Sequence, residues 1–464
     1  MAPPFQIVER TSTLPVSAEE AFAWHERPGA FERLTPPWER VTVLERTGGI
    51  REGARTVVRL GVGPVRVRWE ATHREYVAGR RFVDEQTAGP FSRWTHEHRF
   101  EPADGDRTRY TDRIEFGPPL GAIGAAAGRW LARPRVERML VYRHATLRED
   151  LATLGRYRDR PRLRVAVTGA TGLLGSALVP FLTTAGHTVT RVSRRRGRAG
   201  AIHWDPAAGM IDHAGFEGMD AVVHLAGETI GTRWTEHRKQ RIRESRVEGT
   251  MFLAETLAGL RRPPRVLVAA SALGIYGDRG DEVLSEDAVP EGPTSDFLVE
   301  LGRDWEGAAQ LAQSAGVRVA NLRFGLVLTP AGGALGRMLP PFLVGAGGSL
   351  GSGKQWVSWI SVDDAIGAIH HAVVTEDLAG PVNTAAPEPV TSRTFAATLG
   401  RVLRRPSLLP APAPALRLLF GEMADTALLA GQRLSPARLL SSGYRFRHPT
   451  LEGALRHVLG REDG

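Results

Sequence analysis

The chain has 464 residues and no cysteine, which excludes disulfides, thiolate metal ligands and a cysteine nucleophile. Hydrophobic residues make up 42% and charged residues 24%, a balance typical of a soluble globular protein, and the length predicts two or three domains. The net charge of +9 does not indicate nucleic-acid binding, because the basic residues are scattered among 51 acidic ones instead of forming a stripe.

The first ten residues lack a signal-peptide core, and no apolar run reaches the roughly 18 residues of a membrane helix. We therefore expect a cytoplasmic protein without a membrane span. Nearly all basic residues are arginines, and Lys239 and Lys354 are the two lysines, which indicates a biased coding composition rather than a binding surface.

Residues 1–157 predict a first domain of alternating strands closed by one long helix. Phe5–Leu14 reads as a strand, and Ser17 is the expected N-cap of a helix with Glu20 at its third position. Apolar residues recur at helical spacing up to Leu154 and predict the closing helix. Turn residues separate the segments of an antiparallel meander, whose further strands are expected at 40–45, 55–60, 65–76, 81–85, 93–101 and 107–116.

This order of elements, together with residues 25–38 and 89–98, resembles the START-like (polyketide cyclase/dehydrase-like, SRPBCC) superfamily. The resemblance implies an α+β helix-grip fold whose sheet encloses an apolar cavity for a hydrophobic ligand. The alternative is that the aromatic side chains simply fill the core. The candidate lining residues are Trp38, Trp69, Phe82, Phe91, Trp94 and Trp130.

His96 and His98 lie two residues apart on an expected strand and therefore on the same face. Such a pair can bind a metal ion. We interpret the pair as ordinary strand surface and predict no metal site.

The stretch Val165–Leu178 predicts a strand, a glycine turn and the start of a helix, the order that a dinucleotide site requires. Gly169 is expected to allow the tight turn, Gly172 to let the backbone approach a pyrophosphate, and Gly175 to permit close packing of helix on strand. The helix N-terminus offers unpaired N–H groups to the phosphates. The residues predicted to bind the cofactor are Gly169, Thr171, Gly172, Leu173, Leu174, Gly175, Ser193, Arg194, Arg195, Leu225, Ala226, Gly227 and Ser271.

The second strand of this domain ends at Ser193-Arg194-Arg195-Arg196, where an NAD enzyme carries Asp or Glu for the ribose hydroxyls. A guanidinium pairs with a 2′-phosphate, so NADP(H) is favoured over NAD(H). The alternative is that three arginines in a loop only reflect the composition of an arginine-rich chain.

The spacing of the three glycines, with the strand end Leu225-Ala226-Gly227 and the segment Ile360–Ala365, resembles the extended short-chain dehydrogenase/reductases. Motifs near residues 421–424 and 431–446 resemble the small C-terminal domain of the atypical epimerase family proteins in that superfamily. The resemblance implies a Rossmann-type doubly wound parallel sheet over residues 163–386 and a helical substrate-side domain over residues 387–464.

The superfamily's catalytic Tyr-x-x-x-Lys pair is absent, because none of the six tyrosines has a lysine four residues later. An unassisted phenol, with a pKa near 10, is a poor proton donor or acceptor at neutral pH. Ser271 is the expected catalytic residue by family position, with Tyr276 and Lys239 as candidate substitutes for the missing pair. The plain alternatives are that Tyr276 packs in the core and that Lys239 is solvated. Arg233, Trp234 and Lys354 are the candidate substrate-binding residues.

The main hypothesis is an NADP(H)-binding oxidoreductase or epimerase-like enzyme that acts on an unidentified small molecule, and an apolar substrate would be held or delivered by the first domain. The alternative, which the missing pair favours, is a catalytically impaired cofactor-sensing or hydrophobic-ligand-binding protein. Nucleic acid is not an expected partner, and a homodimer is left open.

Overall fold

The computed structural model describes residues 5–63, 65–117, 121–288 and 296–462, except for the side chains at 62 and 121–131. The chain forms two compact units. The first comprises Met1–Pro161 with Thr183–Gly186 and Leu459–Gly464, and the second comprises Arg162–Leu182 and His187–Val458. Within the described residues, no helix is both long and apolar enough to cross a membrane.

The first unit contains a seven-stranded antiparallel sheet in the order β1-β7-β6-β5-β4-β3-β2. Every strand expected in this region forms, and Ser17 caps the first helix by accepting a hydrogen bond from the Glu20 N–H. The predicted meander and the Ser17 N-cap are therefore confirmed. The elements are β1 (Gln6–Leu14), α1 (Ala18–Glu26), α2 (Ala30–Arg33), β2 (Val41–Arg46), β3 (Arg55–Val62), β4 (Val65–Val77), β5 (Arg81–Ala88), β6 (Arg93–Ala103), β7 (Arg107–Gly117) and α3 (Gly121–Gly155).

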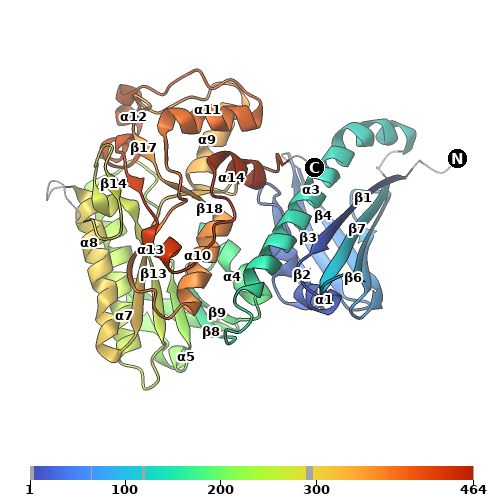
Figure 1. The fold of residues 1–464 in the computed structure, drawn as a ribbon, viewed down its shortest axis with the longest axis horizontal. Helices are drawn as coiled ribbons and strands as arrows, with labels where there is room; N and C mark the ends of the chain where they lie inside the picture. Colours follow the sequence, from blue (N-terminus) through green and yellow to red (C-terminus); the bar gives the residue numbers. More distant parts are fainter. Residues whose placement is uncertain (1–4, 64, 118–120, 289–295, 463–464) are drawn as a thin grey trace. The chain divides into compact units, whose positions relative to one another are not determined.

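The long helix α3 packs across this sheet, as Figure 1 shows. Val136 and Leu140 on the helix are buried against Val8, Ile114 and Phe116 on β1 and β7. Burial of this apolar face holds the helix on the sheet. The helix-grip arrangement expected for the N-terminal domain is the one observed.

The second unit contains an eight-stranded sheet in the order β11-β10-β9-β8-β12-β13-β15-β19, parallel except for β11. Helices cover both faces: α7 and α8 lie on one side and α4 and α10 on the other (Figure 1). The predicted doubly wound Rossmann-type sheet is confirmed. Its strands are β8 (Arg164–Thr168), β9 (Thr188–Ser193), β10 (Ala201–Asp205), β11 (Met210–Ile211), β12 (Ala221–His224), β13 (Val266–Ala272), β15 (Arg318–Phe324) and β19 (Gly380–Thr384). Its helices are α4 (Leu173–Thr184), α5 (His213–Phe216), α6 (Glu236–Arg243), α7 (Gly249–Ala258), α8 (Phe297–Gln310), α9 (Gly333–Leu343) and α10 (Val362–Val374).

The extended segment of residues 318–328 is interrupted at Gly325. β15 ends before this glycine, and β16 (Leu326–Leu328) leaves the main sheet to pair with β18 (Trp359–Ser361). A Cβ at Gly325 would lie 2.7 Å from the Ser358 carbonyl oxygen, so the close crossing of these two segments requires glycine. A periodicity argument does not detect such a crossing.

Residues 388–458 form mostly short helices, as predicted, and belong to the same compact unit as the parallel sheet. Short pairings β14-β21 and β17-β20 tie them to earlier segments. The remaining elements are β14 (Val283–Leu284), β17 (Trp356–Val357), β20 (Val390–Thr391), α11 (Ser392–Leu403), α12 (Ala413–Phe420), β21 (Arg433–Leu434), α13 (Ala437–Ser441) and α14 (Leu451–Val458), with single turns η1 (Pro206–Ala208), η2 (Glu244–Glu248), η3 (Leu273–Tyr276), η4 (Leu311–Ala315) and η5 (Ala424–Leu429).

Candidate functional site

The turn between β8 and α4 has the geometry that its glycines predict. Gly169 has a φ of +64°, and a Cβ there would lie 2.7 Å from the Leu225 carbonyl carbon. A Cβ at Gly175 would lie 2.2 Å from the Gly169 carbonyl oxygen, because α4 packs directly on the end of the strand. At Gly172 the nearest atom would be the same oxygen at 3.2 Å, with nothing else within 4 Å. The turn therefore presents bare main chain beside the helix N-terminus.

The other predicted residues of this turn lie at the start of α4. Thr171 is exposed, and Leu173 and Leu174 are half-buried. The helix is 12 residues long, and the first N–H groups of a helix have no partner within it. The positive end of its dipole and these N–H groups favour an anion at this position.

A buried hydrogen-bond chain fixes the neighbouring strand end, which carries the predicted residues Leu225 and Ala226. Their N–H groups donate to Thr168 Oγ1 at 3.1 and 3.2 Å, and this oxygen lies 2.8 Å from His224 Nδ1. The other ring nitrogen of His224 lies 3.0 Å from Thr250 Oγ1. Sequence reasoning missed Thr168, His224 and Thr250, although a histidine inside a buried strand was a visible signal.

The imidazole of His224 is held neutral. Burial, assisted by the Arg246 guanidinium, lowers its pKa to about 4. A neutral ring donates from one nitrogen and accepts at the other, which matches its two hydroxyl partners. This chain of hydrogen bonds aligns the carboxyl ends of β8 and β12, beside which Gly227 is exposed.

The loop after β9 carries the arginines that favour NADP(H). Arg194, Arg195 and Arg196 are exposed, and none of their side chains makes an ion pair within the described part of the chain. Ser193 Oγ accepts a hydrogen bond of 3.1 Å from the Arg195 N–H, which shapes the turn. The guanidinium groups are therefore available to an external anion.

A second buried network lies at the carboxyl ends of β13 and β15. Ser271 Oγ donates to Glu306 Oε1 at 2.6 Å. Arg323 donates to both Glu306 oxygens at 2.8 and 2.9 Å and to the Tyr276 hydroxyl at 2.5 Å. The Tyr276 hydroxyl in turn donates to Asn383 Oδ1 at 2.9 Å. Ligands of open α/β sheets bind at this end of the strands.

The network determines the ionisation of its members. Burial raises the pKa of Tyr276, and Arg323 only partly opposes this, so the phenol stays protonated at neutral pH. Burial lowers the pKa of Arg323, but the hydrogen bonds to Glu306 outweigh it and hold the pKa above its ordinary value. Tyr276 has no exposed surface and Ser271 only 3%. Sequence reasoning missed Glu306 and Arg323, although Arg323 is a charge within a buried strand, which was a visible signal.

The remaining predicted residues are spread over the second unit. Lys239, on α6, makes ion pairs of 2.9 and 3.0 Å with Glu236 and Glu422. Arg233 is exposed and donates to the Leu418 carbonyl oxygen at 2.6 Å. Trp234 is buried in a cluster with Ile242, Leu301 and Met423, whereas Lys354 is exposed. The structure joins Ser271 and Tyr276 through one network but does not join Lys239 or Lys354 to it.

A pocket in the first unit is small, and apolar and polar side chains both line it. Its volume is about 50 Å³, room for a few water molecules. Among the expected aromatic residues, Trp69 and Phe82 line it. Phe91 and Trp94 pack with Phe116, Trp38 packs on Tyr142, and the side chain of Trp130 lies outside the described residues. The other lining residues are His25, Ala30, Phe31, Leu34, Arg46, Ile50, Thr56, Ala71, His73, Asp84, His98 and Arg143.

The interpretation of His96 and His98 as strand surface is wrong. Their exposed fractions are 5% and 1%, because the face of β6 on which both lie points into the domain interior. Alternation along a strand places two such residues on one face, but it does not show which face is covered.

The fold and the glycine turn define a nucleotide-binding α/β protein of the short-chain dehydrogenase/reductase type. Residues 165–384 match the NAD dependent epimerase/dehydratase family, residues 14–140 match polyketide cyclase/dehydrase and lipid transport proteins, and residues 411–458 match a domain of unknown function, DUF1731. An epimerase family protein of Mycobacterium bovis is 42% identical over 64% of this chain and 98% of its own length. The chain belongs to the epimerase family, with an N-terminal polyketide cyclase-like domain fused to it.

The solved structures that are similar to this chain include a Corynebacterium and a human protein. A nucleoside-diphosphate sugar epimerase from Corynebacterium glutamicum has a TM-score of 0.79 and 32% identity, covering 98% of this chain and 90% of that chain. The human epimerase family protein SDR39U1, solved with NADPH, has a TM-score of 0.59 and 36% identity, covering 64% of this chain and 99% of its own. The first match extends over both units, which supports the fused organisation.

Proposed function

We propose that the second unit binds NADP(H) and serves as a short-chain dehydrogenase/reductase-type oxidoreductase or epimerase-like enzyme for a small molecule. The single observation that carries this proposal is the open main chain at Gly172, beside the α4 N-terminus and with Gly169 and Gly175 closed to any side chain. A pyrophosphate needs such bare backbone and such a helix end. The NADPH in the structure of the human relative agrees with this cofactor.

The residues proposed to hold the cofactor are those at the carboxyl ends of β8, β9, β12 and β13. The glycine turn with Thr171, Leu173 and Leu174 would hold the pyrophosphate, and Leu225, Ala226 and Gly227 would border the ribose. Ser193, Arg194 and Arg195 would take the adenosine end, where an exposed guanidinium suits a 2′-phosphate. In this proposal residues 1–157 form the ligand domain, 163–386 the cofactor domain and 387–464 the substrate-side domain.

The bound cofactor would supply hydride transfer, and the protein would orient the substrate. We assign the substrate contact to Ser271, whose hydroxyl ends the buried strand β13 and is oriented by Glu306. Tyr276 is proposed to act on this site as a positioning residue, because its hydroxyl lies between Arg323 and Asn383. Lys239 is retained as a candidate substitute for the missing lysine, and Arg233, Trp234 and Lys354 as candidates for the substrate side.

The proposal is tested by titrating the full chain with NADPH and with NADH while following the quenching of tryptophan fluorescence. We expect NADPH to bind more tightly than NADH, and the Arg194→Ser/Arg195→Ser double variant to weaken NADPH at least tenfold with little change for NADH. Arg198→Ser, an exposed arginine of the same loop, is the matched control. Absence of binding at high micromolar NADPH would refute the proposal.

Binding without turnover is a distinct outcome. Steady NADPH consumption with a panel of carbonyl substrates, lost in Ser271→Ala, would support the enzymatic part. Cofactor binding with no consumption would instead identify a cofactor-binding protein and leave only the first half of the proposal standing.

A further inference from the structure

The interior face of the first unit's sheet gathers histidines and carboxylates that the cofactor site does not use. Asp84 on β5 lies directly opposite His96 on β6, and His98 on β6 lies directly opposite Asp112 on β7. Asp84 is also opposite His73 on β4. Three neighbouring strand pairs thus bring these side chains together by register alone.

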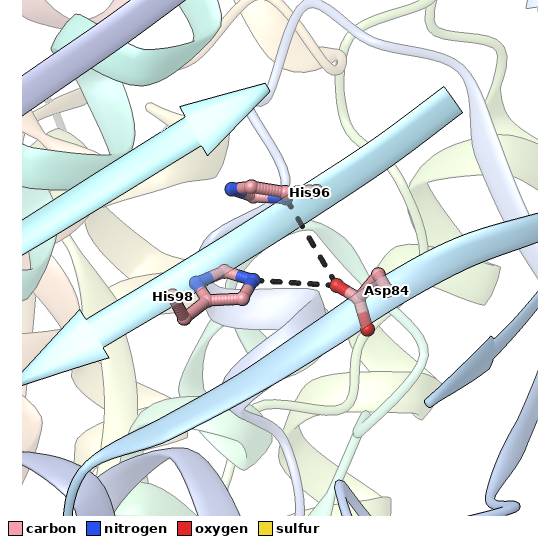
Figure 2. Close-up of side chains that lie close together, drawn as sticks. All are labelled: Asp84, His96 and His98. Atoms are coloured by element: carbon pink, nitrogen blue, oxygen red, sulfur yellow. Dashed lines mark hydrogen bonds and ion pairs between the residues drawn. The ribbon is translucent and has the colours of Figure 1, made fainter. Parts of the chain in front are cut away.

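Asp84, His96 and His98 converge on one point, as Figure 2 shows. Asp84 Oδ2 lies 3.3 Å from His98 Nε2 and 3.9 Å from His96 Nδ1. One ligand atom from each residue lies within 4.8 Å of the other two. Ligand atoms bound at about 2.0–2.1 Å to a tetrahedral metal ion are separated by roughly 3.3 Å. Only small side-chain adjustments would therefore bring the three ligand atoms to these separations.

Asp112 occupies the opposite side of both imidazoles. Its Oδ1 lies 2.7 Å from His98 Nδ1 and 3.2 Å from His96 Nε2, and it accepts a hydrogen bond of 2.7 Å from the Tyr110 hydroxyl. A fully buried carboxylate favours an N–H on each ring nitrogen that faces it. In neutral rings, the nitrogens facing Asp84 then carry lone pairs, which is the carboxylate–histidine–metal arrangement of second-shell orientation.

The geometry points to a divalent transition-metal site formed by Asp84, His96 and His98, with Asp112 orienting both histidines. Two imidazoles and one carboxylate, in a chain without cysteine, suit Zn²⁺, Co²⁺ or Fe²⁺ rather than Mg²⁺ or Ca²⁺. His73 Nε2 lies 2.8 Å from Asp84 Oδ1, the carboxylate oxygen that the two other histidines leave unused. It therefore holds the carboxylate in place.

The proposed ion has an access route and an open coordination position. Asp84 and His98 both line the small pocket of the first unit, which has room for a few water molecules. Three protein ligands and one water are the composition of a catalytic rather than a structural zinc site. The site lies within the first unit alone, so the inference is independent of the function proposed for the second.

The competing explanation is that a protonated His98 lies between two carboxylates and supplies the positive charge itself. Cobalt binding separates the two explanations, because Co²⁺ in a site of nitrogen and oxygen ligands has visible absorption bands. The full chain is treated with a chelator, freed of it and titrated with Co²⁺ at pH 7.5. We expect visible bands that saturate at one equivalent and disappear on adding Zn²⁺, which binds such ligands more tightly.

Variants locate the ion. We expect Asp84→Asn and His98→Gln to abolish the bands, and Asp112→Asn to weaken Co²⁺ binding by about 10- to 100-fold, as second-shell changes do. His213→Gln, an exposed histidine of the second unit, is the control for adventitious binding and should leave the titration unchanged. Far-UV circular dichroism of each variant verifies folding, and a Zn²⁺-induced rise in the wild-type melting temperature is a readout that needs no variant.

Two results would overturn the inference. One is the absence of both bands and thermal stabilisation at 100-fold excess of metal over the wild-type chain. The other is an unchanged Co²⁺ titration in a folded Asp84→Asn variant, which would place the ion elsewhere.

Discussion

Ser271 Oγ donates a hydrogen bond of 2.6 Å to Glu306 Oε1, so the side chain expected to hold a substrate is already tied to a carboxylate. The same carboxylate accepts two hydrogen bonds from Arg323, which is 5% exposed. Glu306 therefore has two functions: it balances a buried cation and orients the serine. Substitutions at the two ends of the hydrogen bond separate these functions.

Ser271→Ala is expected to lower NADPH-dependent turnover at least tenfold while lowering the free energy of unfolding by only about 1 kcal/mol, the contribution of one hydrogen bond. Cofactor affinity should stay within about threefold. Fluorescence titration, steady-state kinetics and urea unfolding measure the three quantities. Full turnover in this variant would remove Ser271 from the reaction.

Glu306→Gln is expected to lower the stability of the second unit by about 3 kcal/mol, because it leaves the buried Arg323 without its counter-charge. The measurement is urea unfolding of the second unit. Glu300→Gln is a control on the same helix, because Glu300 is exposed and should change the stability by less than about 0.5 kcal/mol. Equal losses of stability in Glu306→Gln and Glu300→Gln would contradict the role of Glu306 as the counter-charge of Arg323.

The glycines of the turn should respond differently to a methyl group. Gly175→Ala places a Cβ 2.2 Å from a main-chain oxygen and is expected to cost about 3 kcal/mol of stability through overpacking. Gly172→Ala places a Cβ 3.2 Å from the Gly169 carbonyl oxygen, which a shift of a few tenths of an ångström relieves, so the unit should fold with a loss of at most about 1 kcal/mol but lose NADPH affinity at least tenfold. Gly307→Ala, in α8 with nothing within 4 Å, should be neutral or stabilise by up to about 1 kcal/mol. Thermal unfolding and NADPH titration distinguish the three variants. Normal NADPH binding by Gly172→Ala would contradict the proposal that the glycine turn holds the pyrophosphate.

Local patterns predicted the fold well because each element carried its own signal. The Ser17 capping box, the alternation of the meander and the glycine turn at Gly169 are all readable within a few residues. The two polar networks were not readable in this way. Glu306, Arg323 and Asn383 come from three elements distant in sequence, and only the order of the parallel strands brings them together.

The histidines of the first unit illustrate the same limit. Alternation placed His96 and His98 on one face, but the covering of that face depends on the tertiary packing of the domain. The partner carboxylates Asp84 and Asp112 lie on other strands, and their juxtaposition depends on a register that the sequence does not state.

His224 makes the stability of the second unit depend on pH. Its pKa is about 4 in the folded chain against 6.5 in the unfolded chain, so the unfolded chain binds the proton first as the pH falls. The stabilisation is complete above pH 6.5 and is lost progressively down to about pH 4. Between pH 7 and pH 4.5, His224→Gln should therefore lose less stability than the wild type, by on the order of 2 kcal/mol.

The measurement is the free energy of urea unfolding at several pH values. His213→Gln is the control, because this exposed histidine should leave the pH dependence of the wild type unaltered. If the free energy of unfolding falls with pH equally in the wild type and in His224→Gln, folding does not lower the pKa of this imidazole.

An ion pair between Arg33 and Asp150 holds α2 against α3 in the first unit. Arg33 donates to both oxygens of Asp150 at 2.8 and 2.9 Å, and the exposed fractions are 6% and 0%. Asp150→Asn removes the carboxylate charge that faces the buried guanidinium and should lower the stability of the first unit by about 3 kcal/mol. Replacing both residues, as Arg33→Met/Asp150→Leu, should recover most of this loss, because the cost arises from the single uncompensated charge.

Glu137→Gln removes an exposed pair with Arg133 on the same helix and should cost less than about 0.5 kcal/mol. Hydrogen exchange of the α3 amides beyond residue 131 in urea reports on this unit alone, and a double variant no more stable than Asp150→Asn would show that the pair contributes more than charge balance.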